Sequence, residues 1–339
     1  MTSRERVRRA IEFGHPDRVP ILHGVLPAAY FVHGERLVEL LKEFPDDFGT
    51  NPAIPDKNAL PGPYRKGRHV DEWGCVWEND CDGIHGICVG HPLEDWSNWS
   101  TYKLPPVIAQ EQLDNLQRRL SAPGGHEHYV LGFGTNIFER MQWLRGYETL
   151  MYDLAMNAPE AYTLRDALVE WAVENARLAA QTDIDGMSYS DDWGTQVALI
   201  ISPNTWREFF KPAYRKMFEP GKAAGKHIHF HTDGFTWEIL HDLVEIGVDV
   251  LNVQHTIMDI RAIAKEFGGK VAFRSDLDRQ HILPRGSKQQ IRDHIKEVID
   301  CLGSYGGGLI GHGEIGPDVP LENVRTMLEA WLEFGTYRK

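Results

Sequence analysis

The sequence predicts an α/β protein, a (β/α)8 barrel of the TIM type, with residues 1–339 as one domain that carries an elaborated, loop-rich N-terminal region. Three observations support this prediction. Strand-like and helix-like patterns alternate from about residue 127 onward, which is typical of parallel βαβ units. No glycine-rich phosphate loop follows the first strand, which disfavours an open doubly wound sheet. The 339 residues, of which 42% are hydrophobic, are enough for the core of one large barrel.

The first residues predict a short surface helix. Thr2 and Glu5 have the spacing of a capping box at a helix start. The apolar residues that follow, Val7, Ala10 and Ile11, have amphipathic helical spacing. The chain should therefore open with a helix that buries one face.

The next segments predict the first strand and then a long irregular region. "DRVPI" is typical of a strand with its proline at the margin. Residues 24–105 are rich in proline and tryptophan and predict mostly loops. Within them, "HVDEWGCVWEND" predicts a hairpin or an extended segment.

The remainder of the chain supplies the regular alternation. The predicted strands are "HYVLGFG", "DGMSYS", "HIHFH", "VDVLNVQ", "KVAFRSD" and "GGLIGHGE". The predicted helices are "PEAYTLRDALVEWAVENARLAAQ", "SPNTWREFFKPAYRKMF", "TWEILHDLVEIG", "KQQIRDHIKEVIDCLG" and "LENVRTMLEAWLEF". These strands, with one or two more from the first 125 residues, fit an eight-stranded barrel.

Composition excludes several classes of partner. The formal charge of −13, from 49 acidic and 36 basic residues, disfavours binding to nucleic acid or to an anionic membrane. No apolar run reaches the roughly 18 residues of a membrane span, and the charged start "MTSRERVRRAIEF" differs from a signal peptide. We therefore expect a cytoplasmic protein. Its four cysteines lack the C-x-x-C spacing of zinc clips and are expected to be reduced and mostly structural.

One strand has an unusual polar face. In "KHIHFHTDGF", residues 226–235, side chains of a strand alternate between faces, so His227, His229, His231 and Asp233 share one face. We expect His227, the deepest of them, to be a hydrogen-bonded core residue, whereas His229 fits a core or a functional role equally well. The pair His231 and Asp233 favours function, because i, i+2 spacing brings both side chains to one spot.

Other predicted strands also end in polar residues. These ends carry Asp191 and Asp192, His231 and Asp233, Asn252, Gln254 and His255, Arg274 and Asp276, and His312 and Glu314. Catalytic groups of (β/α)8 enzymes stand at the C-terminal strand ends, so one polar mouth should gather these residues. Asp192 could instead cap the next helix. Arg274 could neutralise Asp276 or bind a substrate carboxylate.

Several motifs together resemble one known superfamily. They are "TSRERVRRAIEFGHPDRVPI", "SYSDDWGTQVALIISPNTWREFFKPAYRKMF", "HTDGFTWEILHDLVEIGVDVLNVQ" and "LIGHGEIGPDVPLENV". The chain resembles the uroporphyrinogen decarboxylase superfamily, which also holds corrinoid- and coenzyme M-dependent methyltransferases. The resemblance covers nearly the whole chain and implies a (β/α)8 barrel with its site at the C-terminal mouth.

The motifs place the chain closer to the methyltransferase-like branch than to true uroporphyrinogen decarboxylases. Those decarboxylases carry an arginine-rich segment after the first strand, whereas "ILHGVLPAAYFVHG" contains no arginine. The "GHG" around His312 and the position of Asp192, where the decarboxylases have "DSWAG", still match their pattern. "HTDG" stands where the methyltransferases have His-x-Cys-Gly, two of their zinc ligands, so Asp233 replaces a cysteine. Their third ligand, also a cysteine, falls on Gly313.

The resemblance implies a metal set and a reaction. His231, Asp233, His312 and Glu314 are the predicted ligands of zinc or another divalent ion. The leading hypothesis is a methyltransferase-like enzyme that moves a methyl group from a small methylated substrate, with a corrinoid protein as the candidate acceptor. The predicted catalytic residues are Asp192, His231, His312 and Glu314, and the predicted substrate-binding residues are Asn252, Gln254, Arg274 and Asp276.

Two alternatives stay open at this point. A decarboxylase of a small acid would use Asp192 and His312 for proton transfer and Arg274 to hold a carboxylate. A non-catalytic barrel would keep the mouth for ligand binding alone. The sequence leaves a homo-oligomer open as well.

Overall fold

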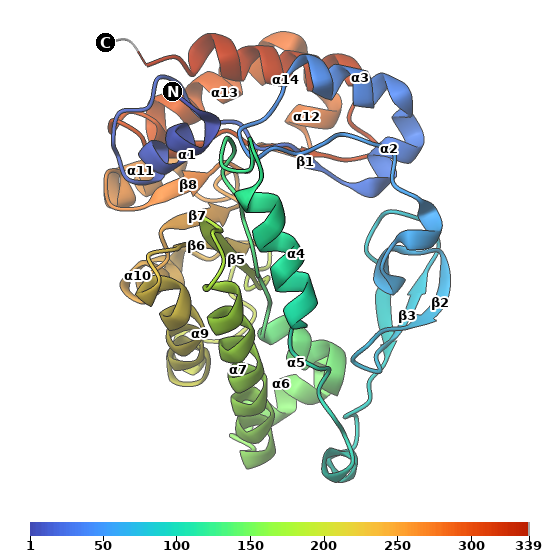
Figure 1. Cartoon of the computed structure of the whole chain (residues 1–339). Coiled ribbons are helices and arrows are strands. Elements are labelled where there is room, and N and C mark those ends of the chain that lie inside the picture. The colour runs from blue at the N-terminus through green and yellow to red at the C-terminus, as the bar shows by residue number, and fades with distance from the viewer. Residues whose placement is uncertain (338–339) are drawn as a thin grey trace.

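The structure, a computed structural model, describes residues 1–337 and confirms the predicted barrel (Figure 1). Its strands are β1 (Gly24–Val25), β2 (Gly67–Val70), β3 (Val76–Asn79), β4 (Ile87–Gly90), β5 (Gly186–Ser190), β6 (His227–Thr232), β7 (Val250–Val253), β8 (Ala272–Arg274), β9 (Leu309–Ile310) and β10 (Glu314–Ile315). The five strands β5 to β9 form one parallel sheet in chain order.

Three extended segments close this sheet into a ring. Leu131 bridges to the start of β5, and Ile21 bridges to Gly311 directly after β9. Asp47 lies between them, because its amide donates to the Ile21 carbonyl at 2.9 Å and its carbonyl accepts from the Tyr129 amide at 3.1 Å. The three segments and the five strands make the ring of eight that a (β/α)8 barrel requires.

The segment "LIGHGE", predicted as one strand, is divided in two. β9 and β10 are separated by residues 311–313, and β10 pairs in parallel with β1. Gly311 lies against the Trp331 ring, where a Cβ atom would approach the indole to 2.8 Å. Helix α14, which carries Trp331, thus packs closely against the chain at the point where the predicted strand is interrupted.

Helices surround the barrel, and most predicted helices are present. The α-helices are α1 (Ser3–Ile11), α2 (Pro27–His33), α3 (Glu35–Glu43), α4 (Gln110–Ser121), α5 (Phe138–Arg145), α6 (Tyr147–Ala155), α7 (Pro159–Ala179), α8 (Pro203–Thr205), α9 (Lys211–Ala223), α10 (Trp237–Glu245), α11 (Ile260–Phe267), α12 (Ile282–Arg285), α13 (Lys288–Leu302) and α14 (Leu321–Phe334). Short 3-10 helices are η1 (Lys57–Ala59), η2 (Gly62–Tyr64) and η3 (Trp96–Ser100). Within residues 1–337, no helix is long and apolar enough to cross a membrane.

The helix predicted over "SPNTWREFFKPAYRKMF" contains an irregular turn. A π-helical turn, η4 (Trp206–Phe210), lies between α8 and α9. Pro212, the second residue of α9, has no backbone N–H to donate to the preceding turn. A local widening of the helix before the proline accommodates this missing donor.

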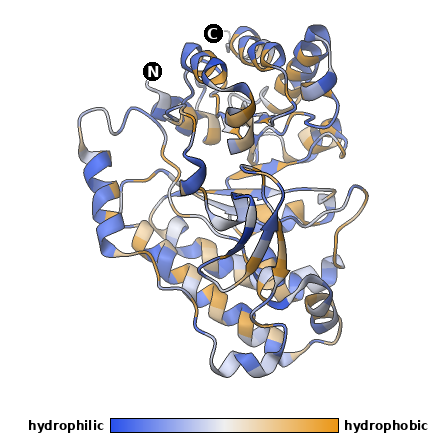
Figure 2. Ribbon diagram, turned by 90° about the vertical axis from the view of Figure 1, so that its right-hand side faces the viewer, coloured by the Kyte–Doolittle hydropathy of each residue, from blue (hydrophilic) through white to orange (hydrophobic). Residues whose placement is uncertain are grey.

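The loop-rich N-terminal region carries a small sheet beside the barrel (Figures 1 and 2). β2 and β3 pair antiparallel, which confirms the predicted hairpin, and β4 adds a third strand that the sequence pattern did not reveal. Figure 2 also shows hydrophobic and hydrophilic residues on the outer helices, as expected where one side covers a core and the other meets solvent.

The N-terminal end of the barrel is closed by apolar packing. Val7 and Ile11 of α1 belong to one buried cluster with the interior residues Tyr129, Val250 and Ile310. Thr2 caps this helix through its side chain, which accepts from the Glu5 amide. With this end sealed, the opposite, C-terminal end of the strands is the one that can expose polar side chains.

Candidate active site at the barrel mouth

Strand β6 carries the predicted column of histidines. At its N-terminal end, the Tyr129 hydroxyl lies 3.0 Å from both His227 Nδ1 and His229 Nε2. His227 Nε2 also lies 3.3 Å from a carboxylate oxygen of Glu12. Burial lowers the pKa of His229 well below its ordinary value, with Arg274 and His227 adding to the effect. These two histidines are therefore neutral hydrogen-bonding residues of the barrel interior.

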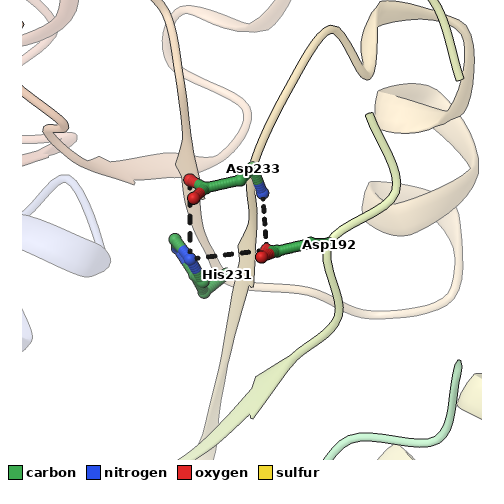
Figure 3. Close-up of side chains that lie close together, drawn as sticks. All are labelled: Asp192, His231 and Asp233. Atoms are coloured by element: carbon green, nitrogen blue, oxygen red, sulfur yellow. Dashed lines mark hydrogen bonds and ion pairs between the residues drawn. The ribbon is translucent and has the colours of Figure 1, made fainter. Parts of the chain in front are cut away.

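His231, two residues further along, faces a different environment. Its Nδ1 donates to Asn252 Oδ1 at 2.7 Å, which directs Nε2 away from β7. Nε2 lies 3.6 Å from Asp233 Oδ1 and 3.7 Å from Asp192 Oδ1, as Figure 3 shows. These distances are too long for good hydrogen bonds.

Each of the two carboxylates accepts a hydrogen bond from a protein group. Asp192 Oδ1 accepts from the Asp233 amide at 3.0 Å (Figure 3). Asp233 Oδ2 accepts from Arg279, whereas within residues 1–337 its buried Oδ1 has no hydrogen-bond partner. This unpartnered oxygen is the one that faces His231. Burial raises the pKa of Asp192, and the Asp233 charge adds to that effect.

Asp192, His231 and Asp233 have the arrangement of a cation site. One ligating atom from each lies within 4.8 Å of the others. Ligand atoms at about 2.1 Å from a common ion lie roughly 3–4 Å apart, which matches the two spacings from His231 Nε2. A histidine ligand usually donates its other ring N–H to an acceptor oxygen behind it, and Asn252 Oδ1 is such an acceptor here. The donor set, one nitrogen and two oxygens, fits zinc or a less thiophilic divalent ion.

The geometry differs from the predicted metal set. Among the described residues, the candidate group contains Asp192 and omits His312 and Glu314. His312 Nδ1 lies 3.0 Å from the Ser275 carbonyl, and a Cβ atom at Gly24 would overlap its ring. Glu314 lies 3.5 Å from the Arg279 guanidinium. Both residues thus border the same mouth, but each has a protein partner.

The imidazole of His312 is neutral at ordinary pH. Burial lowers its pKa well below the ordinary value, and Arg274 contributes in the same direction. His231 is also among the charges that act on it, which places the two histidines in one electrostatic environment. With Nδ1 donating to the Ser275 carbonyl, the neutral ring has Nε2 as a hydrogen-bond acceptor, and the lowered pKa makes it a weak base.

Arg279 is a residue that the sequence analysis missed. Its guanidinium donates to Asp233 and pairs with Glu314, so it bridges β6 and β10 across the mouth. The available signal was a basic residue in "SDLDRQH", in the loop after a predicted strand. The predicted strand ends at Asp276, and Arg279 lies three residues beyond it, outside the set of predicted site residues.

The predicted substrate-binding residues are buried or half-buried, and Asn252 and Gln254 position other groups of the mouth. Gln254 Oε1 accepts from the Gly234 amide at 3.0 Å and so holds the loop after β6. Asn252 Oδ1 accepts from both His231 and Arg274. Within the described residues, Arg274 makes no close ion pair with Asp276, and its buried Nε has no partner. Arg274 thus retains donor capacity for a ligand.

Asp276 has the character of a proton donor. Burial raises its pKa to about 7, and the charges of Asp233 and Glu314 act in the same direction. A cavity of about 260 Å³ beside the mouth is lined by Asp276, Gln254 and Arg279 among others. The cavity therefore exposes an acid that is partly protonated at neutral pH.

Asp191 has a structural role, unlike its neighbour Asp192. Its carboxylate accepts from the amides of Ile137 and Glu139 at 2.9 and 2.8 Å, which caps the start of α5. Tyr214 donates to the same carboxylate. Glu139, which the sequence analysis did not single out, has its pKa raised to about 8 by burial and by Asp191 and Asp192.

A (β/α)8 barrel with acids, histidines and arginines gathered at its C-terminal mouth has the architecture of a TIM-barrel enzyme. The sequence matches the family model of Uroporphyrinogen decarboxylase (URO-D) over residues 101–334. The chain belongs to the uroporphyrinogen decarboxylase family, which confirms the predicted superfamily.

Curated relatives agree with this assignment, and a solved structure has the same fold. Uroporphyrinogen decarboxylases of two Legionella pneumophila strains, Paris and Corby, are 33% and 26% identical over 260 residues, 72% of this chain and 70% of theirs. A methyltransferase from Methanosarcina mazei has the same fold, with a TM-score of 0.69 over 98% of this chain and 99% of that chain. At 17% sequence identity this last likeness concerns the fold alone.

Proposed function

We propose that this protein is a metal-dependent methyltransferase that moves a methyl group from a small methylated substrate to a corrinoid carried by a partner protein. The observation that carries the proposal is the group Asp192, His231 and Asp233, with an unpartnered buried oxygen of Asp233 turned toward the imidazole. The absence of arginine after the first strand supports a substrate other than a polycarboxylate tetrapyrrole.

In this reaction the bond between the methyl carbon and its oxygen or nitrogen breaks, and the atom left behind needs stabilisation. A divalent ion held by Asp192, His231 and Asp233 would supply Lewis-acid assistance to that atom. Asn252 keeps the His231 ring in orientation, and Asp276, with its pKa raised to about 7, can deliver a proton to the leaving atom. Arg274 can anchor an anionic part of the substrate through its free donor.

The test begins with metal content. Chelator-treated protein is reloaded with Zn²⁺, Co²⁺ or Mn²⁺, and bound metal is measured by mass spectrometry after gel filtration. The wild type should retain about one ion per chain, and His231→Ala should lose it. His229→Gln, a change on the same strand face outside the group, is the matched control. Equal metal retention by His231→Ala and the control would refute the site.

The second stage tests the chemistry. Loaded protein is incubated with reduced cobalamin and a panel of small methyl ethers and methylamines, and methylcobalamin is followed by its absorbance. Formation of methylcobalamin from one panel member, lost in His231→Ala, supports the proposal. If the metal-loaded protein forms no methylcobalamin, the metal site stands but methyl transfer is refuted. Decarboxylation is then the reaction to test.

Decarboxylation of a small acid is the second candidate. Arg274, with a free donor, and Asp276, partly protonated at neutral pH, stand at the same mouth and suit a substrate that loses CO₂ and gains a proton. The curated relatives named above are uroporphyrinogen decarboxylases. We expect no useful turnover of uroporphyrinogen here. Coproporphyrinogen formation that is lost in Asp192→Ala would overturn our choice of reaction.

A further inference from the structure

Two of the cysteines lie side by side in the small N-terminal sheet, outside the group Asp192, His231 and Asp233. Cys75 directly precedes β3, and Cys88 lies in β4 opposite Trp77. Cys75 and Trp77 lie on one face of the extended chain, and Cys88 pairs with Trp77. The sulfur atoms of Cys75 and Cys88 therefore lie on the same side of the sheet. Cys75 is buried and Cys88 is half-buried.

Both thiols lie near one carbonyl oxygen, and the Cys88 sulfur also lies 3.6 Å from the Gly90 carbonyl. The Trp143 carbonyl of α5 lies 3.3 Å from the Cys75 sulfur and 3.6 Å from the Cys88 sulfur. His91 Nδ1 lies only 2.8 Å from the same oxygen. A carbonyl oxygen has two lone pairs, and a thiol is a weak donor compared with an imidazole N–H. The Cys75 S–H therefore shares its acceptor with a stronger donor, and loss of both S–H groups would leave the His91 hydrogen bond intact.

The pair is also chemically asymmetric. The neighbouring Cys75 thiol, as a donor, lowers the pKa of Cys88 to about 7, and His91 adds to the effect. The pKa of Cys75 is raised, first by its interaction with Cys88 and then by burial. The thiolate is the reactive form of cysteine, so Cys88 is the attacking sulfur and Cys75 the shielded one. This arrangement is the one found at cysteine pairs that resolve an oxidised sulfur.

We propose that Cys75 and Cys88 form a reversible intrachain disulfide when the protein meets a hydroperoxide. The Cys88 thiolate attacks the peroxide oxygen, an S–O bond forms as the O–O bond breaks, and the departing hydroxide takes up a proton to become water. The Cys75 sulfur then attacks the sulfenic sulfur of Cys88, the S–S bond forms, and a second water leaves. A dithiol reductant restores both thiols.

This modification is independent of the function proposed for the barrel mouth. It revises the expectation of structural thiols for Cys75 and Cys88 and leaves that expectation in place for Cys301, whose pKa is raised by burial. The disulfide would fasten the edge of β3 to β4. His91 would then be the remaining donor of the three to the Trp143 carbonyl.

The test is disulfide mapping on the full chain. Protein is treated with a few equivalents of hydrogen peroxide, remaining thiols are blocked with N-ethylmaleimide, and peptides are analysed by mass spectrometry. An Asp-specific protease is required, because Asp80 and Asp82 separate the three cysteines of this sheet whereas no lysine or arginine lies between Cys75 and Cys88. The expected product is a Cys75–Cys88 cross-link that dithiothreitol removes, with Cys301 alkylated.

Matched variants sharpen the result. Cys81→Ser, which removes an exposed thiol nearby, should keep the cross-link. Cys75→Ser should abolish it and leave a Cys88 sulfenic acid that dimedone traps. A Cys81–Cys88 link in the wild type, or Cys88 oxidised while Cys75 stays alkylated, would overturn the proposal. The wild-type mapping decides the matter even if Cys75→Ser fails to fold.

Discussion

The two halves of strand β6 carry the same residue type on the same face and have opposite roles. In the lower half, His227 and His229 share the Tyr129 hydroxyl in the closed end of the barrel. In the upper half, His231 meets two carboxylates at the open mouth. Strand alternation puts all three imidazoles in one column, but their partners differ.

The difference separates a histidine with buried protein partners from one whose second nitrogen is available to a ligand. His229 has its hydrogen-bonding need met by a neutral hydroxyl in a buried setting, so it contributes stability. His231 has one nitrogen fixed by Asn252 and the other directed at unsatisfied acceptors, so it is prepared for a ligand. His229 lies toward the sealed end of the barrel and His231 toward the open end, and this difference in position gives the two histidines different partners.

The substitution His231→Ala is the strongest test of the difference between the two halves of β6. Loss of a direct ligand should weaken binding of Zn²⁺ or Co²⁺ by more than the roughly 10–100-fold that follows loss of an outer-shell partner. Stability should change by less than about 1 kcal/mol, because the side chain is half-exposed and its loss leaves no sealed cavity. Isothermal titration and urea unfolding measure the two quantities. A large loss of stability with unchanged metal affinity would reverse the assignment of the two halves.

His229→Ala should show the opposite behaviour. Removing a buried ring leaves a cavity and strips the Tyr129 hydroxyl of one partner, so the free energy of unfolding should fall by about 2–3 kcal/mol. Metal affinity should stay within about twofold, since the ring lies outside the candidate group. Urea denaturation gives the first value. If metal affinity falls as far as in His231→Ala, the two halves are not separate.

Asn252→Ala tests the partner that orients His231. The ring should lose its fixed direction, and metal affinity should fall about tenfold, at the low end of outer-shell effects. Asn252→Asp keeps an acceptor oxygen at this position and should restore most of the affinity. Titration of both variants under the same conditions makes the comparison. Equal weakening by alanine and aspartate would show that packing, rather than the hydrogen bond, matters here.

The smallest expected effect concerns pH. The pKa of His229 is well below its ordinary value in the folded protein, so between that low value and about 6.5 the unfolded chain binds the additional proton. Stability from this residue is therefore present above pH 6.5 and is lost as the pH falls. His229→Gln, which does not titrate, should reduce the slope of unfolding free energy by up to about 1.4 kcal/mol per pH unit.

His255 provides a parallel measurement outside β6. Its pKa is lowered to about 3 by burial and by His294, so His255→Gln should flatten the same acid limb. Unfolding followed by circular dichroism from pH 5 to 7 gives the slopes. A slope that neither variant changes would mean that other groups control acid sensitivity.

Periodicity in the sequence was enough to predict the barrel and the strand that carries the candidate metal group. The alternation of strand and helix patterns predicted the parallel sheet, and the period of two in "HIHFHTDG" correctly placed His231 and Asp233 on one interior face. These features are local, because backbone geometry alone determines which side chains share a face. The irregular segment around Asp47 had no such pattern, since it is held by hydrogen bonds to residues far away in the chain.

The composition of the site was decided by tertiary structure. Asp192 joins His231 through the pairing of β5 with β6, and Arg279 reaches Asp233 from the loop after β8, contacts that span 39 and 46 residues of sequence. The separation of structural Asp191 from Asp192 likewise depends on the distant amides that start α5. A side chain's partners depend on how far-apart segments pack, and a strand's own sequence encodes only the direction in which each side chain points.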